Sequence, residues 1–148
     1  MDVNKSKMLA AAIKLSASAH ENQFDKGGMP YVLHPLKVMH YLKTDDIELM
    51  CIAVLHDVIE DCHVTSVELR KIGMTERVIS GVIAMTRRNK ESEDDKFMRL
   101  SSNKDAVLVK LCDLRHNMDI RRLKGVQEKD LKRMNAYCEL YAKLKDKQ

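Results

Sequence analysis

The chain has few of the residues that break helices or staple small folds. It contains two prolines and five glycines among 148 residues, no tryptophan, and only 4% aromatic residues. This composition, together with ten methionines, favours helices over a sheet. Its four cysteines (Cys51, Cys62, Cys112 and Cys138) form no CxxC pair. We therefore expect buried, reduced thiols and no disulfide framework.

Long apolar runs and a strong charge of one sign are also missing. No apolar stretch reaches the roughly 18 residues that a membrane span needs, and residues 1–5 lack the order of a signal peptide. We expect a cytoplasmic protein without a membrane partner.

The net charge of +4 is mild and no basic stripe dominates, which argues against nucleic-acid binding. The basic clusters at 86–90 and 121–124 are either solvated surface or a positive rim around a phosphate-binding cleft. The oligomeric state is left open.

Apolar residues recur at helical spacing along most of the chain, which predicts a single all-α domain over residues 1–148. Asn4, Asp45 or Asp46, Thr65, Thr75 and Asn103 are the predicted N-caps. The segment 106–112 is rich in β-branched residues, so a strand remains possible there. We expect a loop at 25–30 and a flexible polar segment at 86–95. The first three helices are expected at about 5–20, from His34–Pro35 onward, and from the cap at 45 or 46 to 61. Further helices are expected at 65–72, 75–84, 97–100, 103–113 and 128–145. In the last helix the predicted apolar face comprises Leu131, Met134, Cys138, Tyr141 and Leu144.

The most informative stretch is HDVIED at residues 56–61, which follows the apolar run 50–55. Ionisable groups at the end of a buried helix are costly unless they are paired or bind a metal. Imidazole nitrogen and carboxylate oxygen can hold one cation together, so His56 and Asp57 are candidate ligands. Glu60 and Asp61 return to nearly the same helical face as Asp57. Together they indicate metal-assisted hydrolysis.

Two further ligand candidates lie where helices meet polar loops. His34 directly precedes a proline-started helix, and Asp113 ends the apolar run 106–112. Each of these residues also has a structural alternative: His56 as a core histidine, His34 as a helix-start residue, and Asp113 as a turn cap.

The order His34, His56-Asp57, Asp113 resembles the HD phosphohydrolase superfamily, whose members bind a divalent metal through these positions. Four ordered blocks are similar to the RelA/SpoT-type hydrolase domain: AHENQFDKGGMPYVLHP at 19–35, HDVIED at 56–61, GVIAMTR at 81–87 and KLCDLRHNM at 110–118. Because the blocks cover most of the chain in the family's order, the resemblance implies a helical HD-domain bundle.

The resemblance also implies an activity: removal of the 3′-pyrophosphate from (p)ppGpp-like nucleotides with a divalent metal, most typically Mn²⁺. It gives His34, His56, Asp57 and Asp113 as metal ligands and Glu60 and Asp61 as the catalytic pair that orients water and transfers a proton. Lys26 and Asn117 match substrate-contacting positions, and Tyr31 and Arg87 are further candidates. The other histidines are expected to be structural or surface residues.

Two departures put the guanine preference in question. The family's Arg-Lys-Ser-Gly is Asp25-Lys26-Gly27-Gly28 here, so a base-stacking arginine is replaced by a carboxylate that would repel phosphate. The family's Asp-Arg-Leu-His-Asn becomes Asp113-Leu114-Arg115-His116-Asn117, which rotates the arginine by about 100° around a helix. No synthetase or regulatory domain is expected, as in the small stand-alone hydrolases. The alternatives are an HD phosphatase or nucleotidase acting on NADPH or simple (deoxy)nucleotides, and a non-catalytic nucleotide-binding module.

Overall fold

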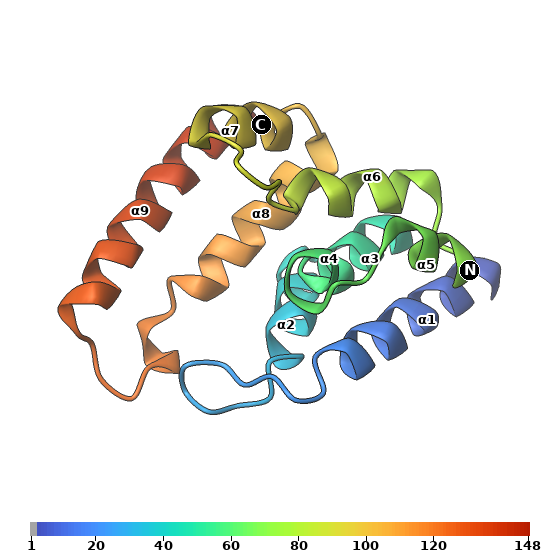
Figure 1. The fold of residues 1–148 in the computed structure, drawn as a ribbon, viewed down its shortest axis with the longest axis horizontal. Coiled ribbons are helices and arrows are strands. Elements are labelled where there is room, and N and C mark those ends of the chain that lie inside the picture. The colour runs from blue at the N-terminus through green and yellow to red at the C-terminus, as the bar shows by residue number, and fades with distance from the viewer. Residues whose placement is uncertain (1–2) are drawn as a thin grey trace.

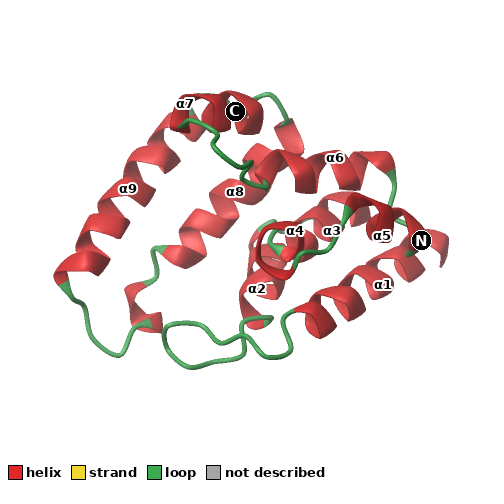
Figure 2. Cartoon of the chain, viewed as in Figure 1, coloured by secondary structure: helices red, strands yellow, loops and turns green. Residues whose placement is uncertain are grey.

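Helices make up the regular structure of residues 3–148, the part of the chain that the computed structural model describes (Figures 1 and 2). Met1 and Asp2, which begin the N-terminal segment considered above, lie outside the described residues. No strand forms within residues 3–148, where β-pairing is confined to an isolated bridge between Phe24 and Pro30. The all-α prediction is confirmed, and the segment 106–112 is helical. In chain order the elements are α1 Val3–Ala19, α2 Leu33–Tyr41, α3 Ile47–Leu55, α4 Val58–Cys62, α5 Ser66–Lys71, α6 Glu76–Met85, α7 Glu93–Ser101, α8 Lys104–Asn117, a 3-10 helix at Ile120–Arg122, and α9 Glu128–Lys145.

Most predicted helix starts are confirmed by side-chain caps. Asp46, Thr65, Thr75 and Asn103 each accept a hydrogen bond from a backbone N–H in the first turn of the helix that follows. These bonds satisfy donors that have no partner inside the helix. The cap predicted at Asn4 is wrong, because α1 begins at Val3 and Asn4 lies inside it.

The core is built around α3, whose residues from Cys51 to Leu55 are fully buried. This helix packs against α1, α2, α6 and α8, so apolar side chains are needed on every side of it. Gly81 of α6 allows the closest approach: a Cβ atom there would lie 2.5 Å from Cδ1 of Ile52. A second, smaller apolar cluster joins residues of α6, α7, α8 and α9.

The apolar face predicted for α9 is only partly buried. Leu144 is fully buried, whereas Leu131 is 59% exposed and Cys138 is exposed. The helix stands at the edge of the molecule and packs mainly on α8, so the far end of its apolar stripe has no neighbour to cover it (Figure 1). The expectation of buried thiols therefore holds for Cys51 but not for Cys138, although all four cysteines are free.

Two predicted boundaries differ from the structure. The helix expected to run to Asp61 is divided into α3 and α4, with a turn at His56 and Asp57. The polar segment 86–95 is shorter than expected, because Ser92 caps a helix that begins at Glu93. None of the helices in residues 3–148 combines the length and apolarity that crossing a membrane requires.

Candidate active site

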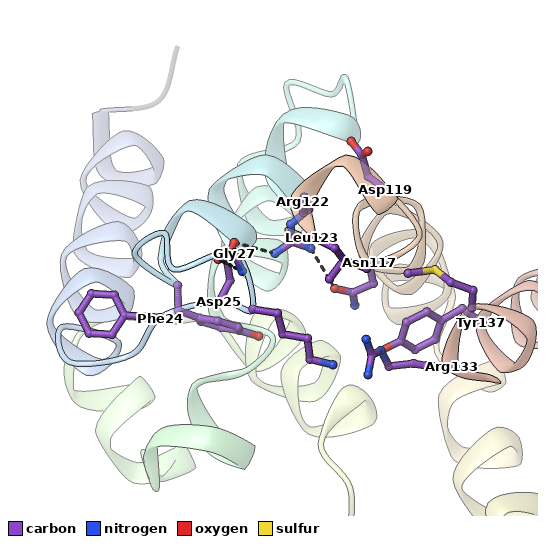
Figure 3. A pocket seen from close by; sticks show the side chains of 12 residues that line it. Phe24, Asp25, Gly27, Asn117, Asp119, Arg122, Leu123, Arg133 and Tyr137 are labelled. Carbon is purple, nitrogen blue, oxygen red and sulfur yellow. Dashed lines mark hydrogen bonds and ion pairs between the residues drawn. The ribbon is translucent and has the colours of Figure 1, made fainter. Parts of the chain in front are cut away.

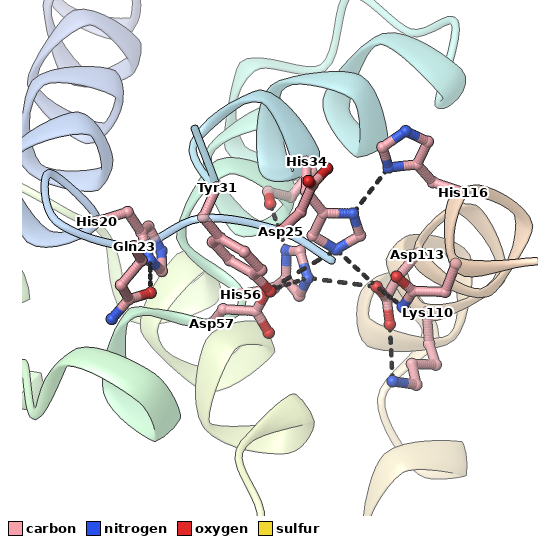
Figure 4. Close-up of polar contacts among 12 residues, drawn as sticks. His20, Gln23, Asp25, Tyr31, His34, His56, Asp57, Lys110, Asp113 and His116 are labelled. Atoms are coloured by element: carbon pink, nitrogen blue, oxygen red, sulfur yellow. Dashed lines mark hydrogen bonds and ion pairs between the residues drawn. The ribbon is translucent and has the colours of Figure 1, made fainter. Parts of the chain in front are cut away.

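The four predicted metal ligands come from three segments that meet at the centre of the bundle (Figure 4). His34 lies in the first turn of α2, His56 and Asp57 occupy the turn between α3 and α4, and Asp113 lies in α8. Both α2 and α8 pack against α3, which brings these segments together. His34, His56 and Asp113 are buried to 3% exposure or less.

The turn at His56 has a local cause. The Nδ1–H of His56 donates a 2.7 Å hydrogen bond to the carbonyl oxygen of Ala53. In a continuing α-helix that carbonyl would accept the N–H of Asp57. Because the ring competes for this acceptor, the backbone departs from the helix at Asp57 (φ −103°, ψ −9°) and α4 starts afresh.

The donor atoms converge on one point. His34 Nε2 lies 2.9 Å from Asp113 Oδ1 and 3.8 Å from Asp57 Oδ2. His56 Nε2 lies 2.9 Å from Asp57 Oδ2 and 3.6 Å from Asp113 Oδ1. Ligand atoms of His34, His56 and Asp57 all lie within 4.8 Å of one another. The structure thus brings the whole predicted ligand set together.

His56 provides the test of whether this set fits a metal. Its Nδ1 is committed to Ala53, and its buried Nε2 makes no hydrogen bond of acceptable geometry to any described residue. A ring whose outer nitrogen is anchored to a carbonyl presents the other nitrogen as a lone-pair donor, which is the usual arrangement of a histidine ligand. Two imidazoles and two carboxylates suit a first-row divalent cation.

The electrostatics at this point also favour a cation. Burial acts to lower the pKa of His56, but Asp57 and Asp113 outweigh it and hold the pKa well above the usual range. Burial acts to raise the pKa of Asp113, yet Lys110, His34 and His56 keep it well below the usual range. The carboxylates that favour a proton on His56 would equally favour a metal ion there.

Two further side chains hydrogen-bond to the carboxylates of the predicted metal ligands. The Tyr31 hydroxyl donates to Asp57 Oδ2 at 2.6 Å, and Lys110 Nζ lies 2.7 Å from Asp113 Oδ2. The pKa of Tyr31 is raised by burial and by Asp57, so the phenol keeps its proton and remains a donor. Tyr31 thus hydrogen-bonds to the predicted metal ligand Asp57 and also lines the pocket described next.

A pocket of about 300 Å³ lies between the loop at 24–31, the end of α8 and the start of α9 (Figure 3). It is lined by Tyr31 and Asn117, which hydrogen-bond to the predicted ligands Asp57 and Asp113. Its wall includes Lys26, Tyr31 and Asn117, three of the four predicted substrate-binding residues. Arg122 and Arg133 add positive charge to the same wall. Burial and the nearby cations, Arg133 foremost, lower the pKa of Lys26, although the charge of Asp130 acts to raise it.

The remaining predicted site residues, Glu60, Asp61 and Arg87, are exposed to solvent. Glu60 and Asp61 are exposed in α4, and Glu60 Oε1 accepts a hydrogen bond from the backbone N–H of Arg87. The pKa of Asp61 is raised by partial burial and by the charges of Asp57 and Glu60. The Arg87 side chain points to Glu93 and does not line the pocket.

The two departures from the family pattern have clear structural outcomes. Arg115 stacks on the ring of Tyr41, with 4.1 Å between the guanidinium carbon and the ring centroid, so the expected change of direction is confirmed. Asp25 holds its own loop, since Oδ1 accepts from the N–H groups of Gly27 and Met29. Although burial acts to raise the pKa of Asp25, these N–H groups and Arg122 lower it. Its negative charge therefore faces a cation within the pocket wall.

Sequence reasoning missed three residues that the structure places at the site: Lys110, His116 and Arg133. Lys110 and His116 stand three residues before and after Asp113, so helical spacing offered a signal for both. His116, expected to be structural or surface, contacts His34 with 2.8 Å between their Nδ1 atoms. Arg133 on α9 carried no signal, whereas Arg122 belonged to a basic cluster already noted as a possible phosphate rim.

Comparison with known proteins extends these observations. Residues 12–148 match the family model described as "HD domain". The chain is 32% identical over 88% of its length to a guanosine-3′,5′-bis(diphosphate) 3′-pyrophosphohydrolase of Haemophilus influenzae, and 35% identical over 88% to that of Vibrio cholerae. It spans about a fifth of these bacterial relatives (21% and 20%).

Two animal proteins are similar over most of their own length. The chain is 31% identical to the pyrophosphohydrolase MESH1 of Danio rerio, covering 82% of this chain and 74% of that protein. It also superimposes on a solved structure of a metazoan SpoT orthologue described as hydrolysing ppGpp. The TM-score is 0.78 at 19% identity, and the match covers 93% of this chain and 84% of that one. This likeness confirms the helical fold.

Proposed function

Because this chain belongs to the HD-domain phosphohydrolases of the RelA/SpoT type, we propose that it is a metal-dependent hydrolase that removes the 3′-pyrophosphate from (p)ppGpp-like nucleotides. The observation that carries the proposal is an adjacency. Ligand atoms of His34, His56 and Asp57 lie within 4.8 Å of one another. Tyr31, which hydrogen-bonds to Asp57, also lines the pocket that contains Lys26, Arg122 and Arg133. A cation site next to an anion-binding wall suits the cleavage of a phosphate ester.

In this proposal His34, His56, Asp57 and Asp113 hold the cation, which we take to be Mn²⁺. Their mixed nitrogen and oxygen donors support a first-row divalent ion. Such an ion lowers the pKa of bound water towards neutrality and offsets charge on phosphoryl oxygens. Tyr31 and Lys110 hold the two carboxylates in place through the bonds described above.

We assign the proton transfers and water orientation to Glu60 and Asp61. Both are exposed at the open side of α4, where substrate has access to them. The raised pKa of Asp61 brings its titration closer to neutrality, which improves a carboxylate as a general base or acid. Glu60 is oriented by the backbone N–H of Arg87.

We assign substrate binding to Lys26, Tyr31, Asn117 and Arg87. Lys26 is placed to neutralise phosphoryl oxygens, and Asn117 lines the same pocket and donates a hydrogen bond to Asp113. Arg87 must release Glu93 before its guanidinium can meet a substrate.

A second candidate function keeps the chemistry and changes the substrate to NADPH or simple (deoxy)nucleotides. Asp25, in place of a base-stacking arginine, favours it. A non-catalytic nucleotide-binding module has least support, since a pure binding module has no need of a complete ligand set. We further propose that residues 1–148 act as one hydrolase domain in the cytoplasm, where the four free thiols would persist.

The test is release of phosphate and pyrophosphate from a panel of nucleotides with added Mn²⁺. The panel contains ppGpp, pppGpp, ppApp, NADPH and ordinary mono-, di- and triphosphates. His56→Ala and Glu60→Ala are run beside matched controls at exposed positions, His40→Ala and Glu21→Ala. We expect pyrophosphate release from 3′-diphosphorylated nucleotides that both site variants lose and both controls keep.

Other results would change the proposal in specific ways. Turnover confined to NADPH or simple nucleotides would move the substrate to the second candidate. Turnover that survives in His56→Ala would remove the metal site from the chemistry. Binding without turnover of any nucleotide would favour the non-catalytic module.

A further inference from the structure

Arg122 joins two parts of the site that are far apart in the sequence. Its Nη1 donates to the backbone oxygen of His116 at 3.2 Å and to Asn117 Oδ1 at 3.3 Å. Its Nη2 donates to Asp25 Oδ2 at 3.4 Å (Figure 3). One guanidinium thus binds both the end of α8, which carries Asp113, and the loop that carries Lys26.

The contact with Asn117 determines how Asp113 is held. Arginine has only donors, so the oxygen of the Asn117 amide must face it, and the amide nitrogen must face away. That nitrogen, Nδ2, donates to Asp113 Oδ1 at 2.8 Å. The same oxygen lies 2.9 Å from His34 Nε2, within the metal-ligand set. Arg122 therefore orients a carboxylate ligand through Asn117.

The contact with Asp25 determines how Lys26 is presented. Asp25 Oδ1 accepts from the N–H groups of Gly27 and Met29 and closes the loop, while Oδ2 faces Arg122. The loop also lies directly against the backbone of residue 122, because a Cβ atom at Gly27 would come within 2.4 Å of the Arg122 carbonyl oxygen. Lys26 stands between Asp25 and Gly27, so its backbone is held on both sides.

The neighbouring arginine makes none of these contacts. Arg121 is 87% exposed and bonds to Asp119 in its own turn, whereas the Arg122 side chain is 21% exposed. The two arginines carry the same charge one position apart, so charge alone does not explain why Arg122 contacts Asn117 and Asp25.

We propose that Arg122 is a positioning residue that couples the metal-ligand set to the Lys26 loop, through Asn117 on one side and Asp25 on the other. It keeps Asp113 and Lys26 in one geometry, so that a cation and a phosphoryl group are received together. The substrate part of this inference rests on the proposed hydrolase function, while the metal part concerns the protein's own ligand set.

The test compares wild-type protein with Arg122→Gln, Arg122→Lys, Asp25→Asn and the control Arg121→Gln. Mn²⁺ affinity is measured by calorimetry. The values of kcat and KM are measured with ppGpp as substrate, and the exchange rates of the backbone amides of Gly27 and Met29 are measured by NMR. Thermal unfolding of each variant without metal shows whether it is folded.

The two contacts predict different results. Both Arg122 variants should lose about 10-fold in Mn²⁺ affinity, the order expected when a group supporting a ligand is removed. They should also raise KM several-fold and speed exchange at Gly27 and Met29. Arg122→Lys should restore neither Mn²⁺ affinity nor slow amide exchange, since a single ammonium cannot reproduce the planar guanidinium, which donates to separate acceptors. Asp25→Asn keeps an oxygen for Gly27 and Met29 but replaces the oxygen that faces Arg122 by an amide donor. Because the loop then loses its bond to Arg122, this variant should raise KM and speed exchange while leaving Mn²⁺ affinity unchanged.

Two results would overturn the inference: Mn²⁺ affinity and exchange in Arg122→Gln equal to those of Arg121→Gln, or full recovery of both in Arg122→Lys. If wild-type protein hydrolyses no 3′-diphosphorylated nucleotide, the proposed function fails separately. The Mn²⁺ and exchange measurements still decide on Arg122 in that case.

Discussion

His34 Nδ1 and His116 Nδ1 lie 2.8 Å apart, although 82 positions of the sequence separate the two residues. The ring planes are nearly parallel, inclined by 12°, and the ring centroids lie 5.1 Å apart. Burial, Arg122 and His34 lower the pKa of His116 to about 4, so its ring is neutral near pH 7 and can accept the Nδ1–H of His34. This bond leaves His34 Nε2 directed at Asp113, as a metal ligand requires.

Replacing His116 by phenylalanine keeps an aromatic ring at this position and removes the acceptor. We expect His116→Phe to weaken Mn²⁺ binding by about 10-fold, since His34 loses the bond that orients it. Calorimetric titration with Mn²⁺ measures the change, and His40→Phe, at an exposed histidine of the same helix as His34, is the control. Equal Mn²⁺ affinity in His116→Phe and wild type would show that packing alone orients His34.

Lys110 and Asp113 form an ion pair in which the aspartate is 4% and the lysine 23% exposed. We expect Lys110→Met to lower the free energy of unfolding by about 2 to 3 kcal/mol in EDTA, near the lower end for a buried pair because the lysine is partly solvated. Saturating Mn²⁺ should reduce this deficit, since the cation restores positive charge beside Asp113.

Urea unfolding with and without Mn²⁺ measures both effects. The control is Lys132→Met, which breaks an ion pair with Glu128 whose side chains are 78% and 85% exposed. It should change stability by less than about 0.5 kcal/mol. A Lys110→Met deficit that Mn²⁺ leaves unchanged would contradict the idea that metal and lysine share one carboxylate.

The sequence singled out four side chains that the structure brings together, because they are chemically unusual in their settings. His56 and Asp57 follow an apolar run, His34 and Asp113 lie where helices meet polar loops, and the resemblance to a family strengthened the last two predictions. The turn at His56 was not predictable from periodicity, since Val58 and Ile59 continue the helical spacing of the residues before them. What divides the helix is one side-chain bond to a carbonyl, and hydropathy patterns carry no information about such bonds.

The pocket wall shows a different limit of sequence reasoning. Asp25 was expected to repel phosphate, because its charge could be read from the sequence but its partner could not. That partner, Arg122, is 97 positions away. Arg133 reaches the same wall only because α9 packs on α8. Such contacts depend on how helices associate, which local patterns do not determine.

Gly81 offers a test of the packing that places α6 against α3. A Cβ atom at this position would lie 2.5 Å from Cδ1 of Ile52, a fully buried side chain. We expect Gly81→Ala to destabilise the protein by about 1 to 3 kcal/mol through overpacking, although alanine alone would favour the helix by roughly 1 kcal/mol. Adding Ile52→Val removes the clashing methyl and should recover part of the loss in thermal unfolding. A higher melting temperature for Gly81→Ala alone would show that α3 and α6 separate easily.

Acid should weaken the connection between α6 and α7 through Glu91. Arg99 binds Glu91 through both carboxylate oxygens and also donates to the carbonyl of Ala84 at the end of α6. The hydrogen bonds from Arg99 lower the pKa of Glu91 from its ordinary value of 4.5 to about 2. A carboxyl group with a lower pKa in the folded state stabilises the protein above its unfolded pKa, and this contribution is lost as pH falls from about 4.5 towards 2.

Glu91→Gln removes that contribution, so its cost should depend on pH. The variant should be less stable than wild type near pH 6, and the difference should shrink near pH 3, where Glu91 in the unfolded wild-type chain is protonated. Urea unfolding at both pH values gives the two differences, with Glu93→Gln, at a 73% exposed glutamate in the next helix, as the control. A cost for Glu91→Gln that is the same at both pH values would mean that the charge of Glu91 does not contribute to stability. The loop between α6 and α7 would then owe its position to Arg99 and the carbonyl of Ala84, and the backbone N–H of Arg87 would stay against Glu60 at low pH.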